Sequence, residues 1–474
     1  MANPSTLVMK FGGTSVGSSH AMNEAVQIVR TARTEWPRVV VVTSAVSGVT
    51  NLLLESASLA AIGNTTHLAD AEKSLYTSHA TIANALISEP DKRDRVMAEI
   101  ENLIALFLDL CRAIAMIGEA SPRTLDAVAS LGERMSVRLL AAIIEGDGLA
   151  AKALDSNELI ITNRHFQNAH PEFEATTGKT REVVLPLLDQ GIVPVITGFI
   201  GATAEGVITT LGRGGSDYSA AIIGAVLSAD DVWIWTDVDG VMTADPRIVP
   251  DARTLPEITY SEMAELAYFG AKVLHPKTMR PVIEAGIGLR ICNTFNPKLP
   301  GTRLVANADV KNLPGNGHVI KAVTAIRNQR LVTIEGRGML GVPGVAARAF
   351  AGVASTGTSV PLITQASSEQ SICFAVPAET CDPVLSVLKK TFASELEESD
   401  IDRVWATEDI SIITVVGSKM RSTPGVAGKV FSKLGSDDVN VLAIAQGSSE
   451  VSISMVVESA KTEKAVRALH TLIV

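Results

Sequence analysis

The stretch TLVMKFGGTS at residues 6–15 decides the fold, because a short apolar run ends directly in two glycines and two hydroxyl residues. The same order returns in VVVVTSAVSG at residues 39–48 and in ITTLGRGGSD at residues 208–217. Such apolar runs are typical of buried strands. Glycine loops that follow parallel strands bring backbone N–H groups and helix N-termini to one crevice, where α/β proteins bind anions. The sequence therefore predicts an anion-binding crevice built from these three loops.

The first 305 residues alternate between strand-like and helix-like stretches, which indicates a mainly parallel sheet covered by helices. Residues 52–117 have helical periodicity without a strand signal, so we expect a helical excursion beside the sheet. Residues 296–317 hold several Pro, Gly and Asn residues and are the predicted linker. The expected strands of the sheet are residues 7–10, 39–44, 192–197, 232–236 and 288–293.

Composition excludes several classes of protein. The chain has 51 acidic and 41 basic residues, a net charge of −10, which argues against a nucleic-acid binder. Aromatic residues are only 4% of the chain, which favours an α/β protein packed with aliphatic side chains over an all-β shell. No apolar run reaches the roughly 18 residues of a membrane span, and the N-terminus does not resemble a signal peptide. We therefore expect a cytoplasmic protein that contacts neither nucleic acid nor membrane.

The four cysteines and eight histidines show no metal-binding spacing, so no metal-ligand set is predicted. The cysteines are expected to be structural thiols in a reducing compartment.

The last third of the chain contains an internal repeat. MLGVPGVAARAF at residues 339–350 aligns with MRSTPGVAGKVF at residues 420–431 without a gap, and Gln365 then aligns with Gln446. Each copy has the order βαββα, which one further strand would complete as a ferredoxin-like βαββαβ module. Residues 401–407 can supply that strand to the first copy. The second copy ends without one, so we expect residues 319–326 to supply it, with the first module inserted within the second.

These patterns predict four parts of the chain. They are a catalytic domain at residues 1–305, a linker with the donated strand at 306–330, a first module at 331–408 and a second module at 409–474.

Isolated charges lie beside the glycine loops in apolar or small-residue surroundings. Charged residues that interrupt strand ends so regularly indicate a functional site. They are Lys10, Glu133, Arg213, Asp217, Asp237, Asp239 and Lys272.

Several long motifs are spread along the chain: KFGGTS at residue 10, VTSAVSGVTN at 42, SLGERMS at 130, TTLGRGGSDYSA at 209, WTDVDGVMTADPR at 235 and YFGAKVLHP at 268. Together they resemble aspartate kinase, and the resemblance covers essentially the whole chain. The paired C-terminal modules resemble ACT domains. The overall pattern is closest to threonine-sensitive monofunctional members and to the kinase half of bifunctional aspartate kinase–homoserine dehydrogenases.

The resemblance implies the amino-acid kinase fold followed by two ACT domains, and it implies a reaction. The γ-phosphoryl group of ATP, with Mg²⁺, would pass to the β-carboxylate of L-aspartate to give 4-phospho-L-aspartate. This is the first step of lysine, threonine, methionine and isoleucine biosynthesis. A carboxylate is ionised at neutral pH, so the nucleophile needs no general base. Catalysis would then rest on positioning and charge neutralisation.

By similarity, Lys10 would contact the transferring phosphoryl group and Asp217 would orient Lys10. Arg213 would hold the α-carboxylate of the substrate and Glu133 its α-ammonium group. The aspartate pocket would be lined by Thr50, Phe199 and Ser216, with Ser44 at the boundary between the two substrates.

The nucleotide side is also implied by similarity. Gly12 and Gly13 would let the backbone approach the phosphates, and Met242 stands where many relatives have a tyrosine. A thioether there can supply apolar contact to adenine but no hydroxyl, or it can simply be a core residue. The remaining nucleotide-side positions are Thr236, Asp237, Arg247 and Lys272.

Paired ACT modules suggest that an end product shifts a conformational equilibrium of the kinase. Gln365 and Gln446 occupy equivalent positions of the repeat, and such glutamines contact threonine in threonine-sensitive relatives. Ser359 and Asn440 are further candidates for the effector site. We favour L-threonine over L-lysine as effector, and we expect a homodimer or larger homo-oligomer through the edges of the ACT sheets.

Two other functions stay open at this point. One is another amino-acid kinase of this fold, acting on glutamate, N-acetylglutamate or UMP, although such relatives generally lack two ACT copies. The other is a catalytically silent amino-acid sensor, which would have no reason to keep Lys10, Glu133, Arg213 and Asp217 together.

Overall fold

The computed structural model describes residues 4–270, 274–306, 319–339, 342–365, 370–420, 422–446 and 451–473. They form two compact units. The first unit holds residues 4–241, 256–260 and 274–306, and the second holds the other described residues. Residues 242–255 and 261–270 thus belong with the C-terminal modules, although they lie within the part of the chain expected to be catalytic.

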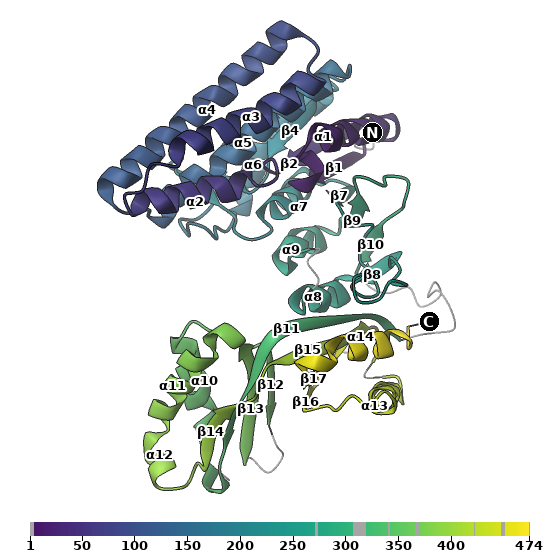
Figure 1. Ribbon diagram of the computed structural model, residues 1–474. Helices are drawn as coiled ribbons and strands as arrows, with labels where there is room; N and C mark the ends of the chain where they lie inside the picture. The colour runs from purple at the N-terminus through teal and green to yellow at the C-terminus, as the bar shows by residue number, and fades with distance from the viewer. Residues whose placement is uncertain are drawn as a thin grey trace. The chain divides into compact units, whose positions relative to one another are not determined.

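The first unit is built on an eight-stranded sheet with the order β3-β4-β2-β1-β7-β9-β10-β8 (Figure 1). Its neighbouring strands are parallel except for β10, which is antiparallel to β9. A separate ribbon pairs β5 (Ile200–Ala202) with β6 (Ile208–Thr210). The strands are β1 (Thr6–Phe11), β2 (Arg38–Thr43), β3 (Ala151–Leu154), β4 (Val193–Thr197), β7 (Asp231–Thr236), β8 (Glu257–Thr259), β9 (Gly288–Asn293) and β10 (Thr302–Val305). The five strands expected from the sequence are all present.

Helices of the first unit follow the expected pattern, and the predicted helical excursion is confirmed as α2, α3 and α4. These helices pack with α5 (Figure 1), and their apolar side chains share one core with β1 and β2. The helices are α1 (Ser19–Glu35), α2 (Val49–Ala61), α3 (Leu68–Leu86), α4 (Pro90–Ile117), α5 (Pro122–Gly146), α6 (Phe173–Asp189), α7 (Gly215–Leu227) and α9 (Pro276–Ala285), with the turns η1 (Thr14–Val16) and η2 (Ser156–Glu158).

Helix starts agree with local sequence signals. The Ser18 hydroxyl accepts the N–H of Ala21 at 3.2 Å, and the Ser121 hydroxyl accepts the N–H of Thr124 at 3.3 Å. Both serines are N-caps, and Pro122 follows the second one at the position where proline suits a helix start.

The predicted linker from residue 296 is wrong for residues 302–305, which form β10. Gly301 adopts φ +66°, and a Cβ there would lie 1.9 Å from the carbonyl oxygen of Ile291. After this close turn the chain runs back beside β9 as the antiparallel strand β10, in which Thr302 and Leu304 are buried. A four-residue strand after a tight glycine turn leaves almost no periodic signal, which explains the error. Residues 307–318 of the predicted linker lie outside the described residues.

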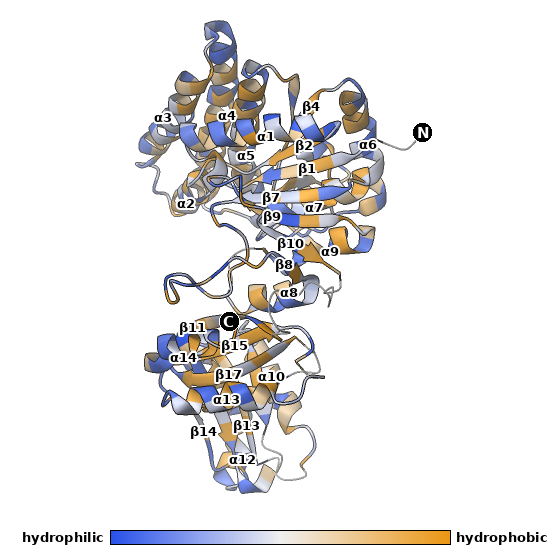
Figure 2. Ribbon diagram, turned by 90° about the vertical axis from the view of Figure 1, so that its right-hand side faces the viewer, coloured by the Kyte–Doolittle hydropathy of each residue, from blue (hydrophilic) through white to orange (hydrophobic). Residues whose placement is uncertain are grey.

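The second unit contains one sheet with the order β12-β13-β11-β15-β17-β16, and β14 also pairs with β11. Figure 2 shows that β15 and β17 are apolar along much of their length, in agreement with their burial. The strands are β11 (Ile320–Glu335), β12 (Leu362–Gln365), β13 (Ser371–Pro377), β14 (Arg403–Ala406), β15 (Ile410–Gly417), β16 (Ala443–Ala445) and β17 (Ser452–Glu458). The helices are α8 (Tyr260–Tyr268), α10 (Val345–Ser355), α11 (Cys381–Thr391), α12 (Ala393–Glu397), α13 (Val426–Ser436) and α14 (Thr462–His470), with the turns η4 (Arg337–Met339), η5 (Ala378–Thr380) and η6 (Ser459–Lys461).

Strand β11 belongs to both repeated modules. Its residues 320–329 pair with β15, and its residues 329–335 pair with β13. The strand expected from residues 319–326 is therefore present and pairs with β15 of the second module. In the sequence it precedes the first module, so the first module is inserted between this strand and the rest of the second module. The first module was expected to begin with a strand of its own at residue 331, and this was wrong. Residues 320–335 form one continuous strand, with a register shift between Ile326 and Gln329. Asn328 adopts φ +57° at this irregularity.

Among the described residues, none of the helices combines the length and the apolar run that crossing a membrane requires. The four cysteines are free thiols, and all but Cys373 are buried.

Replacing Phe374 with alanine should destabilise the second unit by about 3–5 kcal/mol, because the mutation leaves a cavity in a fully buried position. The free energy of unfolding of the second unit, measured in urea for wild type and Phe374→Ala, gives this loss. Val342 is the control, because it is an apolar residue of the same unit that is 50% exposed. A Val342→Ala loss as large as that of Phe374→Ala would contradict this description of the core.

Candidate active site

The carboxyl ends of four parallel strands form one continuous rim in the first unit. Backbone hydrogen bonds join the residues that end or follow β7, β1, β2 and β4, so these segments are fixed against one another. The N–H groups of Gly12, Ser44 and Gly198 donate to the carbonyl oxygens of Trp235 (3.1 Å), Phe11 (3.1 Å) and Thr43 (2.8 Å). The rim is the place where open α/β sheets bind ligands.

A buried ion pair lies at this rim. Lys10 on β1 is 8% exposed, and its Nζ lies 2.5 Å from Oδ1 of Asp217 in the first turn of α7. The structure thus brings together the two residues expected to be catalytic, from positions 207 residues apart in the sequence.

The glycines after β1 leave room around this lysine. A Cβ on Gly12 would lie 3.4 Å from Lys10 Nζ, and a Cβ on Gly13 would lie 3.2 Å from the carbonyl oxygen of Ala45. A side chain at either position would crowd the rim. The backbone beside Lys10 is therefore open to a ligand such as a phosphate group.

Glu133 is a buried carboxyl group that faces the same rim from α5. It is 3% exposed, and burial raises its pKa to about 8, although N–H groups of Glu133 and Ala45 and the charge of Lys10 oppose the rise. Among the described residues, its Oε2 has no hydrogen-bond partner. A buried carboxyl oxygen without a partner fits the ammonium group of a ligand, because the ion pair would offset the cost of desolvation.

Phe199 holds an unusual backbone conformation beside the rim, with φ +67°. Its N–H donates to the Ser219 hydroxyl at 2.9 Å, and its ring lies against Gly215, where a Cβ would be 2.5 Å from Cδ2. A Cβ on Gly198 would likewise lie 2.6 Å from Cβ of Ser216. Non-glycine residues keep such conformations only where surrounding contacts fix them, and they cluster at functional sites. The structure thus places Phe199 and Ser216 next to each other at the rim.

The other residues expected to bind aspartate lie on loops and helix starts near the rim. Ser44 directly follows β2, and Thr50 lies in the first turn of α2, where each is half-buried. Arg213 is exposed between Gly212 (φ +77°) and Gly214 (φ +69°), just before α7. Left-handed glycines on both sides indicate a loop whose shape a side chain would disturb.

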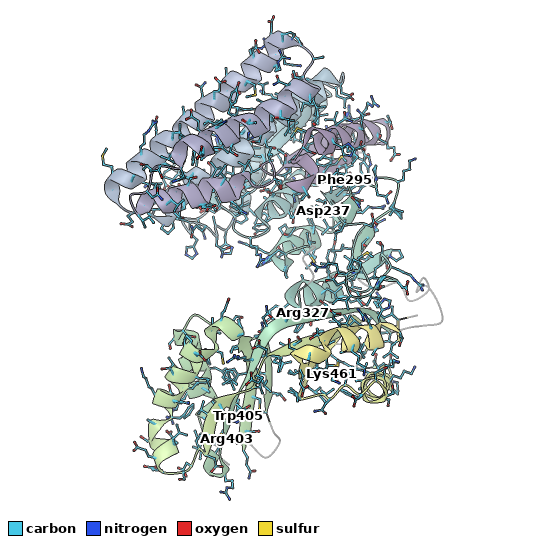
Figure 3. The ribbon with its side chains drawn as sticks, in the orientation of Figure 1. Asp237, Phe295, Arg327, Arg403, Trp405 and Lys461 are labelled. Carbon is cyan, nitrogen blue, oxygen red and sulfur yellow. The ribbon has the colours of Figure 1, made fainter. Side chains whose placement is uncertain are left out.

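The residues expected on the nucleotide side are divided between the two units. Thr236 ends β7 in the first unit and Asp237 follows it, and the Thr236 hydroxyl donates to Asp237 at 3.1 Å. Figure 3 labels Asp237 and Phe295, which follow the neighbouring strands β7 and β9. Met242 and Arg247 belong to the second unit, and Lys272 lies outside the described residues.

Met242 and Arg247 have partners within their own unit. The Thr254 hydroxyl lies 3.4 Å from the Met242 sulfur, and Arg247 pairs with Asp245 at 2.7 Å while remaining 88% exposed.

The residues expected to bind an effector lie on equivalent elements of the two modules. Gln365 ends β12 and Gln446 follows β16, and both are exposed. Ser359 and Asn440 precede the same two strands. The segments that follow the glutamines, residues 366–369 and 447–450, lie outside the described residues.

Asp126 is a site residue that sequence reasoning missed. It is 1% exposed on α5, and its carboxylate accepts the Thr210 hydroxyl at 2.7 Å and the Gln167 N–H at 2.9 Å. Burial raises its pKa, while these hydrogen bonds act in the opposite direction. It fixes the end of β6 just before the Arg213 loop. The signal in the sequence that could have identified Asp126 is a single acidic residue on an otherwise apolar helix face.

Comparison with known proteins agrees with this geometry. Residues 5–293 match the Amino acid kinase family, and residues 332–392 and 413–472 match the ACT domain. The chain is 37% identical over 465 residues to bifunctional aspartokinase/homoserine dehydrogenase 2, chloroplastic, of Arabidopsis thaliana, with 98% of this chain and 50% of that protein covered. It is 35% identical over 472 residues to aspartokinase 2, chloroplastic, of Arabidopsis thaliana, with 98% and 84% covered.

Solved structures show the same fold. The crystal structure of Escherichia coli aspartokinase III in complex with aspartate and ADP is 32% identical, covers 99% of both chains and has a TM-score of 0.80. Aspartate kinase of Clostridium acetobutylicum is 26% identical, with a TM-score of 0.81 and 99% of this chain covered. The chain spans about half the length of the bifunctional relatives. The fold and the rim define an amino acid kinase, and the chain belongs to the aspartokinases within that family.

Replacing Glu133 with glutamine should change how stability depends on pH. Below about pH 4.5 the carboxyl is protonated in both folded and unfolded chains, so wild type and Glu133→Gln should differ little. As pH rises toward 8, the unfolded chain loses this proton first, and wild type should become less stable than the variant by on the order of a few kcal/mol.

Urea unfolding at several pH values, without ligand, measures this difference. Glu119→Gln is the control, because Glu119 is exposed. Parallel stability curves for wild type and Glu133→Gln would show that Glu133 is not a buried carboxyl group of raised pKa.

Proposed function

We propose that this chain is an aspartate kinase that transfers the γ-phosphoryl group of ATP to the β-carboxylate of L-aspartate, giving 4-phospho-L-aspartate. The observation that carries the proposal is the Lys10–Asp217 pair beside the buried Glu133 carboxyl, at a rim with open glycine backbone. Among the described residues, Oε2 of Glu133 has no hydrogen-bond partner. Relatives named aspartokinases, one of them solved with aspartate and ADP, support the same reaction.

The chain's own residues supply positioning and charge for this reaction. The β-carboxylate of aspartate is the nucleophile, and it is already ionised near neutral pH, so no residue must remove a proton. Lys10 stabilises the charge that spreads over the transferring phosphoryl oxygens, and Asp217 holds the ammonium group in place. Because Lys10 is buried and the side chain of Asp217 is only 14% exposed, water screens their charges weakly.

Two residues orient the amino acid. The α-ammonium group binds Glu133, which then becomes ionised because the new ion pair lowers its pKa. The α-carboxylate binds Arg213, whose planar guanidinium can form two parallel hydrogen bonds. The β-carboxylate is thereby directed toward Lys10, with Ser44, Thr50, Phe199 and Ser216 around it.

ATP would lie with its phosphates against Gly12 and Gly13, where no side chain blocks the backbone. Thr236, Asp237, Met242, Arg247 and Lys272 are proposed for the adenosine side, on sequence similarity. The described residues contain no cluster of three potential metal ligands. We therefore propose that Mg²⁺ binds mainly phosphate oxygens of ATP, as it commonly does in phosphoryl transfer, and neutralises their charge.

The ACT modules are proposed to carry feedback inhibition by L-threonine, through Gln365 and Gln446 with Ser359 and Asn440 nearby. L-Lysine is the alternative effector, and Escherichia coli aspartokinase III has been crystallised with lysine and aspartate. A homodimer or larger assembly through the ACT sheet edges fits the exposed apolar residues Ile363 on β12 and Ile444 on β16. Free cysteines are consistent with the proposed cytoplasmic location.

Replacing Lys10 with methionine should lower kcat for aspartate-dependent ADP release by about 10²-fold or more, because a preorganised charge on the phosphoryl group is lost. The KM for L-aspartate should change much less. Lys152→Met is the control, because Lys152 on β3 is exposed. Turnover that survives in Lys10→Met at the wild-type rate would contradict the assigned role.

Replacing Gln446 with alanine should raise the L-threonine concentration that half-inhibits turnover by about tenfold, since a charge-assisted hydrogen bond to the effector is lost. The rate without effector should stay the same. The assay compares L-threonine with L-lysine on wild type, Gln365→Ala and Gln446→Ala. Inhibition by L-lysine alone would assign the alternative effector, and inhibition unaffected by both variants would remove the glutamines from the effector site.

A further inference from the structure

A cationic hollow of about 460 Å³ lies in the first unit beside the Arg213 loop. Three segments form it: the loop before α6, the loop into α7 and the start of α9. None of the residues that line it is a carboxylate. Five of them carry or can carry a positive charge, namely His170, Arg213, His275, Lys277 and Arg280.

The positive charges around the hollow repel one another and so disfavour the protonated forms of its histidines. Burial lowers the pKa of His275, and the charges of Arg213 and Lys277 lower it further, with Asp217 acting in the opposite direction. Burial also lowers the pKa of His170, with a further contribution from Lys277. An anion in the hollow would relieve this repulsion, which is a driving force for binding.

Lys277 supplies a fixed charge in the wall of the hollow. Its Nζ donates to Oδ1 of Asn168 at 2.8 Å and to the carbonyl oxygen of Leu211 at 3.3 Å, and it lies 5.1 Å from the centre of the Tyr218 ring. These contacts come from three different segments. Lys277 therefore keeps the walls of the hollow in a fixed arrangement while adding one positive charge.

Two guanidinium groups remain available to a ligand. Arg280 donates from Nε to Glu284 at 2.8 Å, which leaves its terminal nitrogens for other acceptors. Arg213 is exposed and has no ion-pair partner among the described residues. Guanidinium groups bind carboxylates through two parallel hydrogen bonds, so two of them suit an anion with two carboxylates.

We propose that this hollow is a binding site for a small dicarboxylate, held between Arg213 and Arg280. Inorganic phosphate shares the oxyanion chemistry and is the other source that a test must separate. Arg213 is also the residue proposed to hold the α-carboxylate of L-aspartate, so a ligand in the hollow competes with the substrate. This competition rests on the proposed function, whereas binding to the hollow does not.

The test is a calorimetric titration of the full chain with succinate, without nucleotide or aspartate. Wild type should show saturable binding, and Arg280→Met should weaken it by about tenfold, because one charge-assisted carboxylate contact is lost. Arg112→Met is the matched control, because Arg112 is also exposed and paired along its own helix, with Asp109. Its binding should equal that of wild type.

Three results would overturn the proposal. They are the absence of saturable succinate binding, equal binding by wild type and Arg280→Met, and tighter binding of inorganic phosphate than of succinate in a parallel titration. Arg280 is exposed on the surface of α9, and equal melting temperatures of both variants and wild type would show that folding is intact.

Kinetics then separate this inference from the proposed function. Succinate should raise the KM for L-aspartate in wild type and much less in Arg280→Met. A chain without aspartate-dependent turnover would refute the proposed kinase activity, while the titration would still decide whether the hollow binds a dicarboxylate.

Discussion

The buried ion pair of Lys10 and Asp217 is the interaction on which the site depends. A lysine with 8% exposure at the end of a central strand requires a nearby countercharge, because an unpaired buried ammonium group is costly. Asp217 can supply it only if α7 begins at the rim, and that in turn requires the left-handed glycine before the helix and the close approach of Gly215 to Phe199. The glycine loops therefore set the position of the charge as well as the space for phosphate.

The second unit depends on a comparable constraint. Strand β11 supplies the central pairing of both repeated modules, so neither module completes its sheet without the other. Helix α8 is held to this unit by Glu262, which is fully buried and pairs with Lys321 on β11 at 2.9 Å. Breaking a buried pair by removing one partner typically costs about 3–5 kcal/mol. Residues 261–270 are thereby fixed to the second unit.

Sequence reasoning succeeded where the signal is local or repeated. Apolar runs located the five strands of the parallel sheet. The missing last strand of the second copy indicated that residues 319–326 would complete the second module. Sequence reasoning failed for β10, because a strand of four residues is too short to give a periodic signal. It also split β11 into two strands near residues 326–329, where the pairing with β15 shifts register but the strand continues. Asp126 and Lys277 were missed because their partners lie 84 and 109 residues away, and no local pattern marks such contacts.

The most direct test of this account is to identify the phosphorylated product. Hydroxylamine converts acyl phosphates into hydroxamates, so Mg·ATP and each acceptor are incubated with the chain in its presence and the hydroxamate is identified by mass spectrometry. The account predicts the β-hydroxamate of aspartate, in the same amount as ADP, and none from L-glutamate or N-acetylglutamate. ADP release without aspartyl hydroxamate, or hydroxamate from another acceptor in preference to aspartate, would contradict it.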